Sequence, residues 1–158
     1  MGSTTATQKA EIPAGLTTPA MDIRFTETIP DEMLAWDELL AGWVGECPLV
    51  AIADLDDAPA GIVLLRPHTI EGRRCVEYLH AALIPAVRGR GLFRPLLRAC
   101  ASALADLGYT AVVGAYPFAL NDPRIGGVVE SIGARPVHDT GDRLWYFMPL
   151  VKEPAHVR

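Results

Sequence analysis

Cysteine is scarce in this chain, and its positions argue against two common classes of small protein. Cys47, Cys75 and Cys100 are odd in number, lie far apart and form no CxxC pair. A disulfide framework needs paired cysteines and a zinc ribbon needs closely spaced ones, so neither is indicated. We therefore expect no metal site, and a reducing compartment, the cytoplasm.

Long apolar runs are also missing. No uninterrupted apolar stretch reaches the length of a membrane span, and residues 1–20 lack the apolar centre of a signal peptide. These first residues, rich in Ser, Thr, Ala and Pro, are expected to form a flexible tail. The 158 residues leave room for one domain, which we place at 21–151, with a short C-terminal tail at 152–158.

The chain has no excess of positive charge. Nineteen acidic and 14 basic side chains give a formal net charge of -5, which disfavours a protein that binds nucleic acid or an anionic membrane surface non-specifically. A cationic or neutral partner fits better. Half of the residues are hydrophobic and 21% are charged, a composition typical of a packed globular domain.

Hydrophobic periodicity and turn residues predict a mixed α/β (α+β) fold, with one sheet and helices on its faces. The expected helices span 30–43, 91–107 and a segment from 121–123 to 133; the expected strands span 21–26, 49–53, 62–65, 75–84, 110–116, 136–138 and 144–150. Turn residues predict loops at 54–61 and 66–74. Because a helix separates strands 75–84 and 110–116, these two should run parallel as a right-handed crossover.

A glycine-rich turn lies at the start of that crossover. Gly89 and Gly91 follow the strand at 75–84 and lead directly into the next helix. Closely spaced glycines let backbone N–H groups approach an anion, and a helix N-terminus adds to the site. Arg88, Arg90 and Arg94 supply positive charge, so a phosphorylated ligand is one interpretation. The other is a plain strand-to-helix turn with a solvated arginine face.

In this context the chain resembles the GNAT superfamily of acyl-CoA-dependent N-acetyltransferases. The family signature is Arg or Gln, two residues, Gly, one residue, then Gly or Ala, between an apolar-x-Pro strand end and a helix; residues 83–92 reproduce it with Arg88 and Gly91. Phe93 departs from the last signature position. The segment 131–136 is similar to the family's Gly-Phe-x-x region, and the order of elements agrees from about Ala51 to Leu150.

The resemblance implies a mostly antiparallel central sheet with one parallel pair, and acetyl-CoA as the co-substrate. It implies that backbone groups of Ala81 and Leu83 bind the pantetheine and the acetyl carbonyl. Asn121 would lie beside the pantetheine arm, and it is also a good helix N-cap. The diphosphate would be held by the amides of six consecutive residues, Arg88, Gly89, Arg90, Gly91, Leu92 and Phe93.

The catalytic residues are less clearly indicated. Glu77 occupies the position from which histone-type members take their general base, although a plain strand carboxylate is the alternative. His80, one strand face away from Glu77, could act as a base through water or be a buried structural histidine. Val129 stands where many members have a general-acid tyrosine. Tyr116 is the best substitute acid, and a core or rim aromatic is its alternative role.

Together these features predict an acetyl-CoA-dependent N-acetyltransferase that modifies a small-molecule amine by direct attack. One alternative is acetylation of a protein or peptide amine. Another is a non-catalytic acyl-CoA-binding regulatory module, suggested by Val129 and Phe93. The aromatic run 145–147 could support a homodimer or cap the core.

Overall fold

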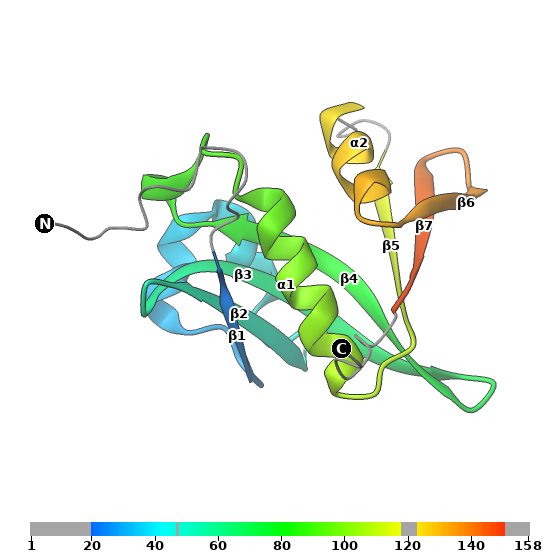
Figure 1. Cartoon of the computed structure of the whole chain (residues 1–158), viewed down its shortest axis with the longest axis horizontal. Coiled ribbons are helices and arrows are strands. Elements are labelled where there is room, and N and C mark those ends of the chain that lie inside the picture. The colour runs from blue at the N-terminus through cyan, green and yellow to red at the C-terminus, as the bar shows by residue number, and fades with distance from the viewer. Residues whose placement is uncertain (1–19, 47, 118–122, 151–158) are drawn as a thin grey trace, which may run out of the picture.

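The computed structural model describes residues 20–46, 48–117 and 123–150, which form a seven-stranded sheet with helices on both faces (Figure 1). The strand order is β1-β2-β3-β4-β5-β7-β6, and every neighbouring pair is antiparallel except β4 and β5, which are parallel. The strands are β1 (Asp22–Thr26), β2 (Leu49–Leu55), β3 (Ala58–Ile70), β4 (Arg73–Leu83), β5 (Ala111–Pro117), β6 (Arg135–Asp139) and β7 (Arg143–Pro149).

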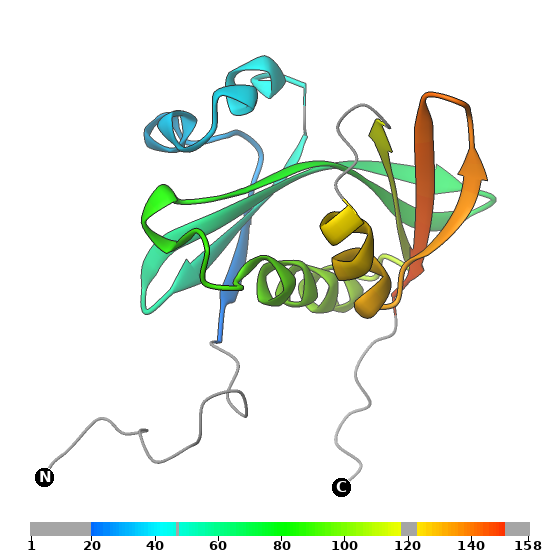
Figure 2. The ribbon, with the colours of Figure 1, turned by 90° about the horizontal axis from the view of Figure 1, so that it is seen from above.

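The helices lie in two groups on opposite faces of the sheet (Figure 2). One face carries α1 (Phe93–Asp106) and α2 (Pro123–Ser131), and the other carries two short 3-10 helices, η1 (Asp31–Trp36) and η2 (Glu38–Trp43). A third 3-10 turn, η3 (Pro85–Val87), follows β4. The predicted mixed α+β fold with a parallel crossover is confirmed. Within the described ranges, no helix is long and apolar enough to cross a membrane.

Strict alternation along β2 and β3 creates two cores. Odd-numbered residues such as Ala51 and Val63 pack with Leu96 of α1, whereas even-numbered ones such as Ile52 and Ile62 belong to the cluster under η1 and η2. Successive strand side chains point to opposite faces, so a strand that is apolar throughout serves both layers. The central strands are therefore covered on both sides.

The hairpins β2–β3 and β3–β4 have shorter turns than predicted. The prediction of loops at 54–61 and 66–74 is wrong. Strand pairing continues until only Asp56–Asp57 and Glu71–Gly72 remain as turns. All four residues have positive φ, as a two-residue type I′ hairpin turn requires, and Asp and Gly tolerate this region. Segment 66–70 therefore belongs to a strand, which brings its polar side chains onto the sheet.

The helix predicted at 30–43 is also different: it is divided into η1 and η2. Asp37 separates them with an extended backbone, φ -159° and ψ 125°, and its carboxylate Oδ1 accepts a hydrogen bond from Leu39 N at 2.8 Å. Asp competes with helix by binding nearby backbone N–H groups in this way, so it starts a new helix instead of continuing the old one. The break leaves the Asp37 side chain facing the sheet.

Candidate functional site

The parallel pair β4–β5 is joined over only part of its length. Paired positions run from Cys75↔Ala111 to Tyr78↔Gly114, whereas β4 continues to Leu83 and β5 to Pro117. Beyond Tyr78, the edge of β4 that faces β5 has no strand partner among the residues that the structure describes. Parallel α/β sheets bind ligands where neighbouring strands part at their carboxyl ends, so this opening is a natural ligand site.

The glycine-rich turn stands at the end of this open edge. Gly89 and Gly91 have φ of 80° and 72°, which non-glycine residues rarely adopt, and both are exposed. A side chain built at either position would meet no atom within 4 Å. Their conformation, and not crowding, therefore requires glycine, and the backbone here is open to an approaching ligand.

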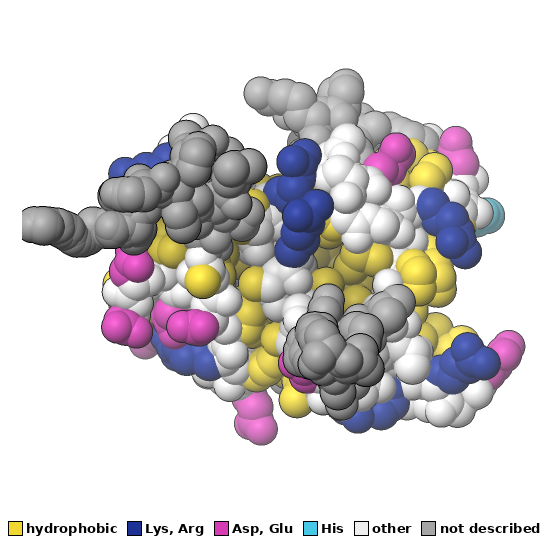
Figure 3. Space-filling model, in the orientation of Figure 1, with side chains coloured by type: hydrophobic (Ala, Val, Ile, Leu, Met, Phe, Trp, Pro, Cys, Tyr) yellow, Lys and Arg dark blue, Asp and Glu magenta, His cyan; other side chains and the backbone are white. Residues whose placement is uncertain are grey.

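The turn leads into the amino-terminus of α1, whose first N–H groups have no side-chain cap. Leu92 is buried and the Phe93 ring packs into the cores on both sides of α1, so the bulky residue at the last signature position points away from the turn. Pro95 lies in the first turn, where its missing N–H costs nothing. Basic side chains lie over the amino-terminal half of α1 (Figure 3). An uncapped helix start with this charge suits an anion.

Arg88 links three backbone segments instead of pointing into solvent. Its Nε donates to the Leu83 carbonyl at 2.9 Å, and its Nη2 donates to the Trp36 carbonyl at the end of η1. The side chain thus ties the glycine-rich turn to the end of β4 and to the opposite helical layer. One lone pair of the Leu83 carbonyl is already used, so its N–H is the freer group for a ligand.

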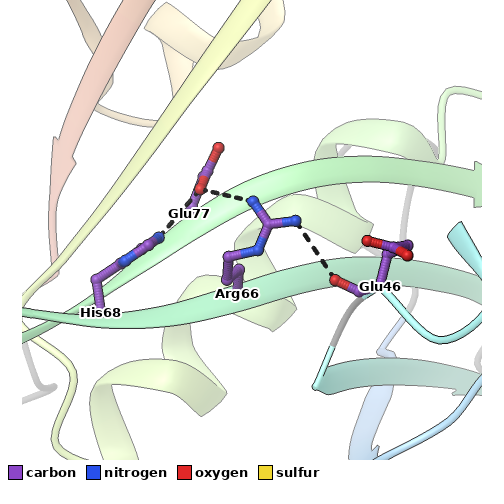
Figure 4. A network of polar contacts seen from close by, with 4 residues as sticks. All are labelled: Glu46, Arg66, His68 and Glu77. Carbon is purple, nitrogen blue, oxygen red and sulfur yellow. Dashed lines mark hydrogen bonds and ion pairs between the residues drawn. The ribbon is translucent and has the colours of Figure 1, made fainter.

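Glu77 lies in a cluster of polar side chains on the η1–η2 face of the sheet (Figure 4). Its Oε1 is 3.0 Å from His68 Nε2 and 3.3 Å from Arg66 Nη1, and Arg66 also donates to the Glu46 carbonyl at 3.4 Å. The Glu77 side chain is 22% exposed, so it reaches solvent despite these contacts. Both partners come from the part of β3 that was predicted to be a loop.

His80 shares this face with Glu77, contrary to the prediction that the two lie on different faces. A β-bulge explains the difference: Leu64 pairs with His80 and Leu65 with Tyr78, which leaves an extra residue in β4 between them. The extra residue changes the alternation, so His80 points where Glu77 does. Its Nε2 lies 3.0 Å from Asp37 Oδ2 at the break between the two 3-10 helices.

Other predicted residues have structural roles or fall outside the description. Val129 is buried with Leu97 and Tyr146, so it fills the core at the position of the expected acid. Tyr116 pairs with Leu144 through its backbone, but its side chain is outside what the structure describes, as is all of Asn121.

The aromatic run 145–147 and the two described cysteines are mainly packing residues. Tyr146 is buried, while Trp145 and Phe147 are half-buried, and the Arg135 guanidinium lies 5.4 Å from the Phe147 ring centre. The free thiols of Cys75 and Cys100 are buried in the core.

Sequence reasoning missed the partners of the polar cluster. Asp37, Arg66 and His68 come from segments that were interpreted as helix interior or loop, and no local pattern joins them to β4. The tight-turn pair Glu71-Gly72 was the available signal for Arg66 and His68, since a two-residue hairpin fixes which residues of the two strands face each other. Asp37 carried no comparable signal.

Comparison with known proteins finds similar structures but no similar sequence. No family model and no curated protein matches the sequence. Among solved structures, a Bacillus subtilis acetyltransferase in complex with CoA aligns with TM-score 0.62 at 13% identity, over 83% of this chain and 99% of that one. The ribosomal-protein-S18-alanine N-acetyltransferase of Escherichia coli aligns with TM-score 0.57 at 13% identity, over 86% and 99%. A spermidine N-acetyltransferase chimera from Vibrio cholerae and hSSAT aligns with TM-score 0.57 at 12% identity, over 82% and 96%. The chain therefore has the GNAT acetyltransferase fold.

Proposed function

We propose that this protein is an acetyl-CoA-dependent N-acetyltransferase that modifies a small-molecule amine by direct attack. One observation carries the proposal: the open Gly89–Gly91 turn runs into the uncapped start of α1, beside the stretch of β4 that β5 leaves unpaired. These features suit a long ligand with a diphosphate at one end and a reactive group at the other. The shared fold with an acetyltransferase in complex with CoA supports the same ligand.

The chain's own groups supply a binding partner for each part of acetyl-CoA. In the proposal, the amides from Arg88 to Phe93 bind the diphosphate, and Arg90 and Arg94 supply exposed positive charge. Backbone groups of Ala81 and Leu83 lie along the open edge of β4 and would hold the pantetheine and the acetyl carbonyl. Asn121 is proposed to lie beside the pantetheine arm.

Direct transfer needs two proton movements and no covalent enzyme intermediate. The acceptor nitrogen forms a bond to the thioester carbonyl carbon, the carbon–sulfur bond breaks, the amine loses one proton and the departing thiolate gains one. Glu77 and His80 are two described groups on the η1–η2 face of β4 that can accept a proton from the acceptor amine. Tyr116 is proposed as the acid. The position where many family members have a tyrosine is Val129, a buried core residue with no proton to donate.

Charge on the η1–η2 face supports a cationic acceptor. Residues 25–65 contain nine acidic side chains and no Lys, Arg or His. Asp54 pairs with Arg24, and Asp56 and Asp57 form a hairpin turn, so these three have structural roles. Asp31, Glu32, Asp37, Glu38 and Glu46, in and beside the two 3-10 helices, lie nearer to the polar cluster and would attract an ammonium group.

A protein or peptide amine is the second candidate acceptor. It is favoured by the structural similarity to a ribosomal-protein-alanine N-acetyltransferase. Turnover with a panel of free amines but not with peptides supports the first candidate, and the reverse supports the second.

Calorimetric titration with CoA and acetyl-CoA tests the cofactor site directly. Gly91→Glu places a carboxylate and a strained backbone at the diphosphate position, so we expect it to abolish micromolar binding. Gly72→Glu is the matched control, because Gly72 also has positive φ, 79° against 72°, and also has open space for a side chain, but it lies in the β3–β4 turn. Equal binding by wild type, Gly91→Glu and Gly72→Glu would show that the glycine-rich turn is only structural.

A further inference from the structure

His80 and Asp37 form a fixed pair beside the strand opening. His80 Nε2 lies 3.0 Å from Asp37 Oδ2, and the two side chains are 19% and 23% exposed. The other carboxylate oxygen, Oδ1, accepts the Leu39 N–H at 2.8 Å. Both oxygens of Asp37 are therefore engaged, which holds the carboxylate, and through it the imidazole, in one orientation.

This contact also decides which nitrogen of His80 carries the proton. An ionised carboxylate only accepts hydrogen bonds, so Nε2 must be the donor and the lone pair of neutral His80 lies on Nδ1. Nδ1 makes no hydrogen bond to any residue within 20–46, 48–117 or 123–150. A histidine whose one nitrogen is held by a carboxylate and whose other nitrogen carries a lone pair has the arrangement of a general base with its orienting group.

His80 is better placed for the reaction than Glu77. Glu77 lies opposite Val113, within the stretch where β4 and β5 still pair and the sheet is closed. His80 lies two residues beyond the last pair, Tyr78↔Gly114, next to the open backbone edge of Ala81. Along β4, His80 is therefore nearer than Glu77 to a thioester held at that open edge.

The two side chains also differ in what already binds them. Oε1 of Glu77 lies 3.0 Å from His68 Nε2 and accepts a hydrogen bond from Arg66 Nη1 at 3.3 Å, so this carboxylate already has a cationic partner on β3. Accepting a proton at Nδ1 of His80 displaces none of the hydrogen bonds described, and the Nε2 contact to the Asp37 carboxylate then becomes an ion pair between opposite charges.

We propose that His80 is the general base of the acetyl transfer and that Asp37 is its positioning residue. This inference rests on the proposed N-acetyltransferase function. As the nitrogen–carbon bond forms and the carbon–sulfur bond breaks, the proton of the attacking amine passes to Nδ1 of His80, and the imidazolium then releases it to solvent. The thiolate takes its proton from the proposed acid or from water. Glu77 instead holds Arg66 and His68 in place on the η1–η2 face, where the acceptor amine would bind.

The test compares His80→Gln, Asp37→Asn and Glu77→Gln in steady-state acetyl transfer, with acetyl-CoA affinity measured by calorimetry on each. A general base contributes about a hundredfold or more, so His80→Gln should lower kcat by about that factor with acetyl-CoA affinity unchanged. Asp37→Asn should lower kcat about tenfold, and Glu77→Gln should cost less than tenfold. His138→Gln, on the exposed edge strand β6, is the matched control and should keep wild-type rates.

The pH dependence of kcat separates a base from a merely structural histidine. If His80 is the base, the low-pH limb of the wild-type kcat profile should change in His80→Gln, whereas loss of a merely structural histidine would leave the shape of that profile unchanged. If His80→Gln does not fold, His80→Asn and the ring ¹⁵N shifts of wild type give the second readout: the Nε2–H form must dominate for His80.

Three outcomes overturn the proposal. His80→Gln within threefold of the wild-type kcat, with Glu77→Gln lowered a hundredfold, assigns the base to Glu77 and leaves the N-acetyltransferase function intact. An Nδ1–H form of His80 removes the lone pair from the proposed position. Acetyl-CoA binding by wild type without turnover of any amine or peptide removes the enzymatic function itself, and the general base with it.

Discussion

The contact between Gly61 of β3 and Leu96 of α1 offers a sharp test of how α1, and with it the glycine-rich turn, is held on the sheet. A Cβ at Gly61 would lie 3.0 Å from Leu96 Cδ1 and 3.2 Å from Cδ2, closer than carbon atoms normally approach. Leu96 is fully buried, and its N–H makes the first turn of α1 by donating to the Leu92 carbonyl. The two positions should therefore be strongly coupled.

The single substitutions act in opposite ways. Leu96→Ala removes buried methyl groups and leaves a cavity, which should cost about 3 kcal/mol of unfolding free energy. Gly61→Ala gains about 0.5–1 kcal/mol because alanine is less flexible than glycine in the unfolded chain, but overpacking against Leu96 costs about 1–3 kcal/mol. We expect a net loss of about 1 kcal/mol for this variant.

In the Leu96→Ala background, the effect of Gly61→Ala on the free energy of unfolding should change sign. Without the Leu96 methyl groups the new Cβ has room, so Gly61→Ala should stabilise the Leu96→Ala protein by about 1 kcal/mol. The coupling in a double-mutant cycle is then about 2 kcal/mol, measured by urea unfolding followed by circular dichroism. Additivity within about 0.5 kcal/mol would show that α1 does not pack on Gly61, and the placement of the turn beside β4 would lose its support.

Two further predictions concern the same layer. Burial raises the pKa of the Cys100 thiol to about 12, because desolvation disfavours the thiolate. The thiol of the unfolded chain loses its proton at lower pH than the thiol of the folded chain. The free energy of unfolding should therefore fall by about 1.4 kcal/mol per pH unit as pH rises from about 9 toward 12. Cys100→Ala should lack this part of the pH dependence. Gly114→Ala would place its Cβ 3.2 Å from the Tyr78 Cβ and should cost about 1–3 kcal/mol in urea unfolding. The control Gly127→Ala meets no atom within 4 Å inside α2 and should gain up to about 1 kcal/mol, so equal effects of the two would contradict the packing described.

The sheet and its parallel crossover could be predicted because they depend on local patterns. Alternating or continuous apolar runs in β2–β5 and the 3.6-residue stripe of α1 reflect burial against one or two neighbouring layers. Gly89, Gly91 and the helix that follows them are equally local, since the φ of 80° and 72° at these two positions strongly favours glycine. The resemblance to the GNAT signature rests on this same segment, and the fold agrees with it.

The errors occurred where a residue's nearest contacts lie far away along the chain. Asp37 looked like a helix-interior residue, yet its carboxylate starts η2 and contacts His80. Arg66 and His68 looked like loop residues, yet tight turn chemistry extends β3 and places them opposite β4. A composition rich in Asp, Gly and Pro indicates a turn without indicating how few residues the turn needs.

The sequence by itself determined the apolar centre of each strand, where the glycine-rich turn lies and that the chain forms one mixed sheet, because those properties follow from periodicity and from backbone conformations over a few neighbouring residues. Only the tertiary structure decided which polar groups face the strand opening. A single extra residue in β4, between the pairs Leu64↔His80 and Leu65↔Tyr78, places His80 on the same face as Glu77. The break at Asp37 brings a carboxylate to it from 43 residues away in the chain. Strand register and helix packing set such contacts, and both depend on the whole core rather than on any local pattern.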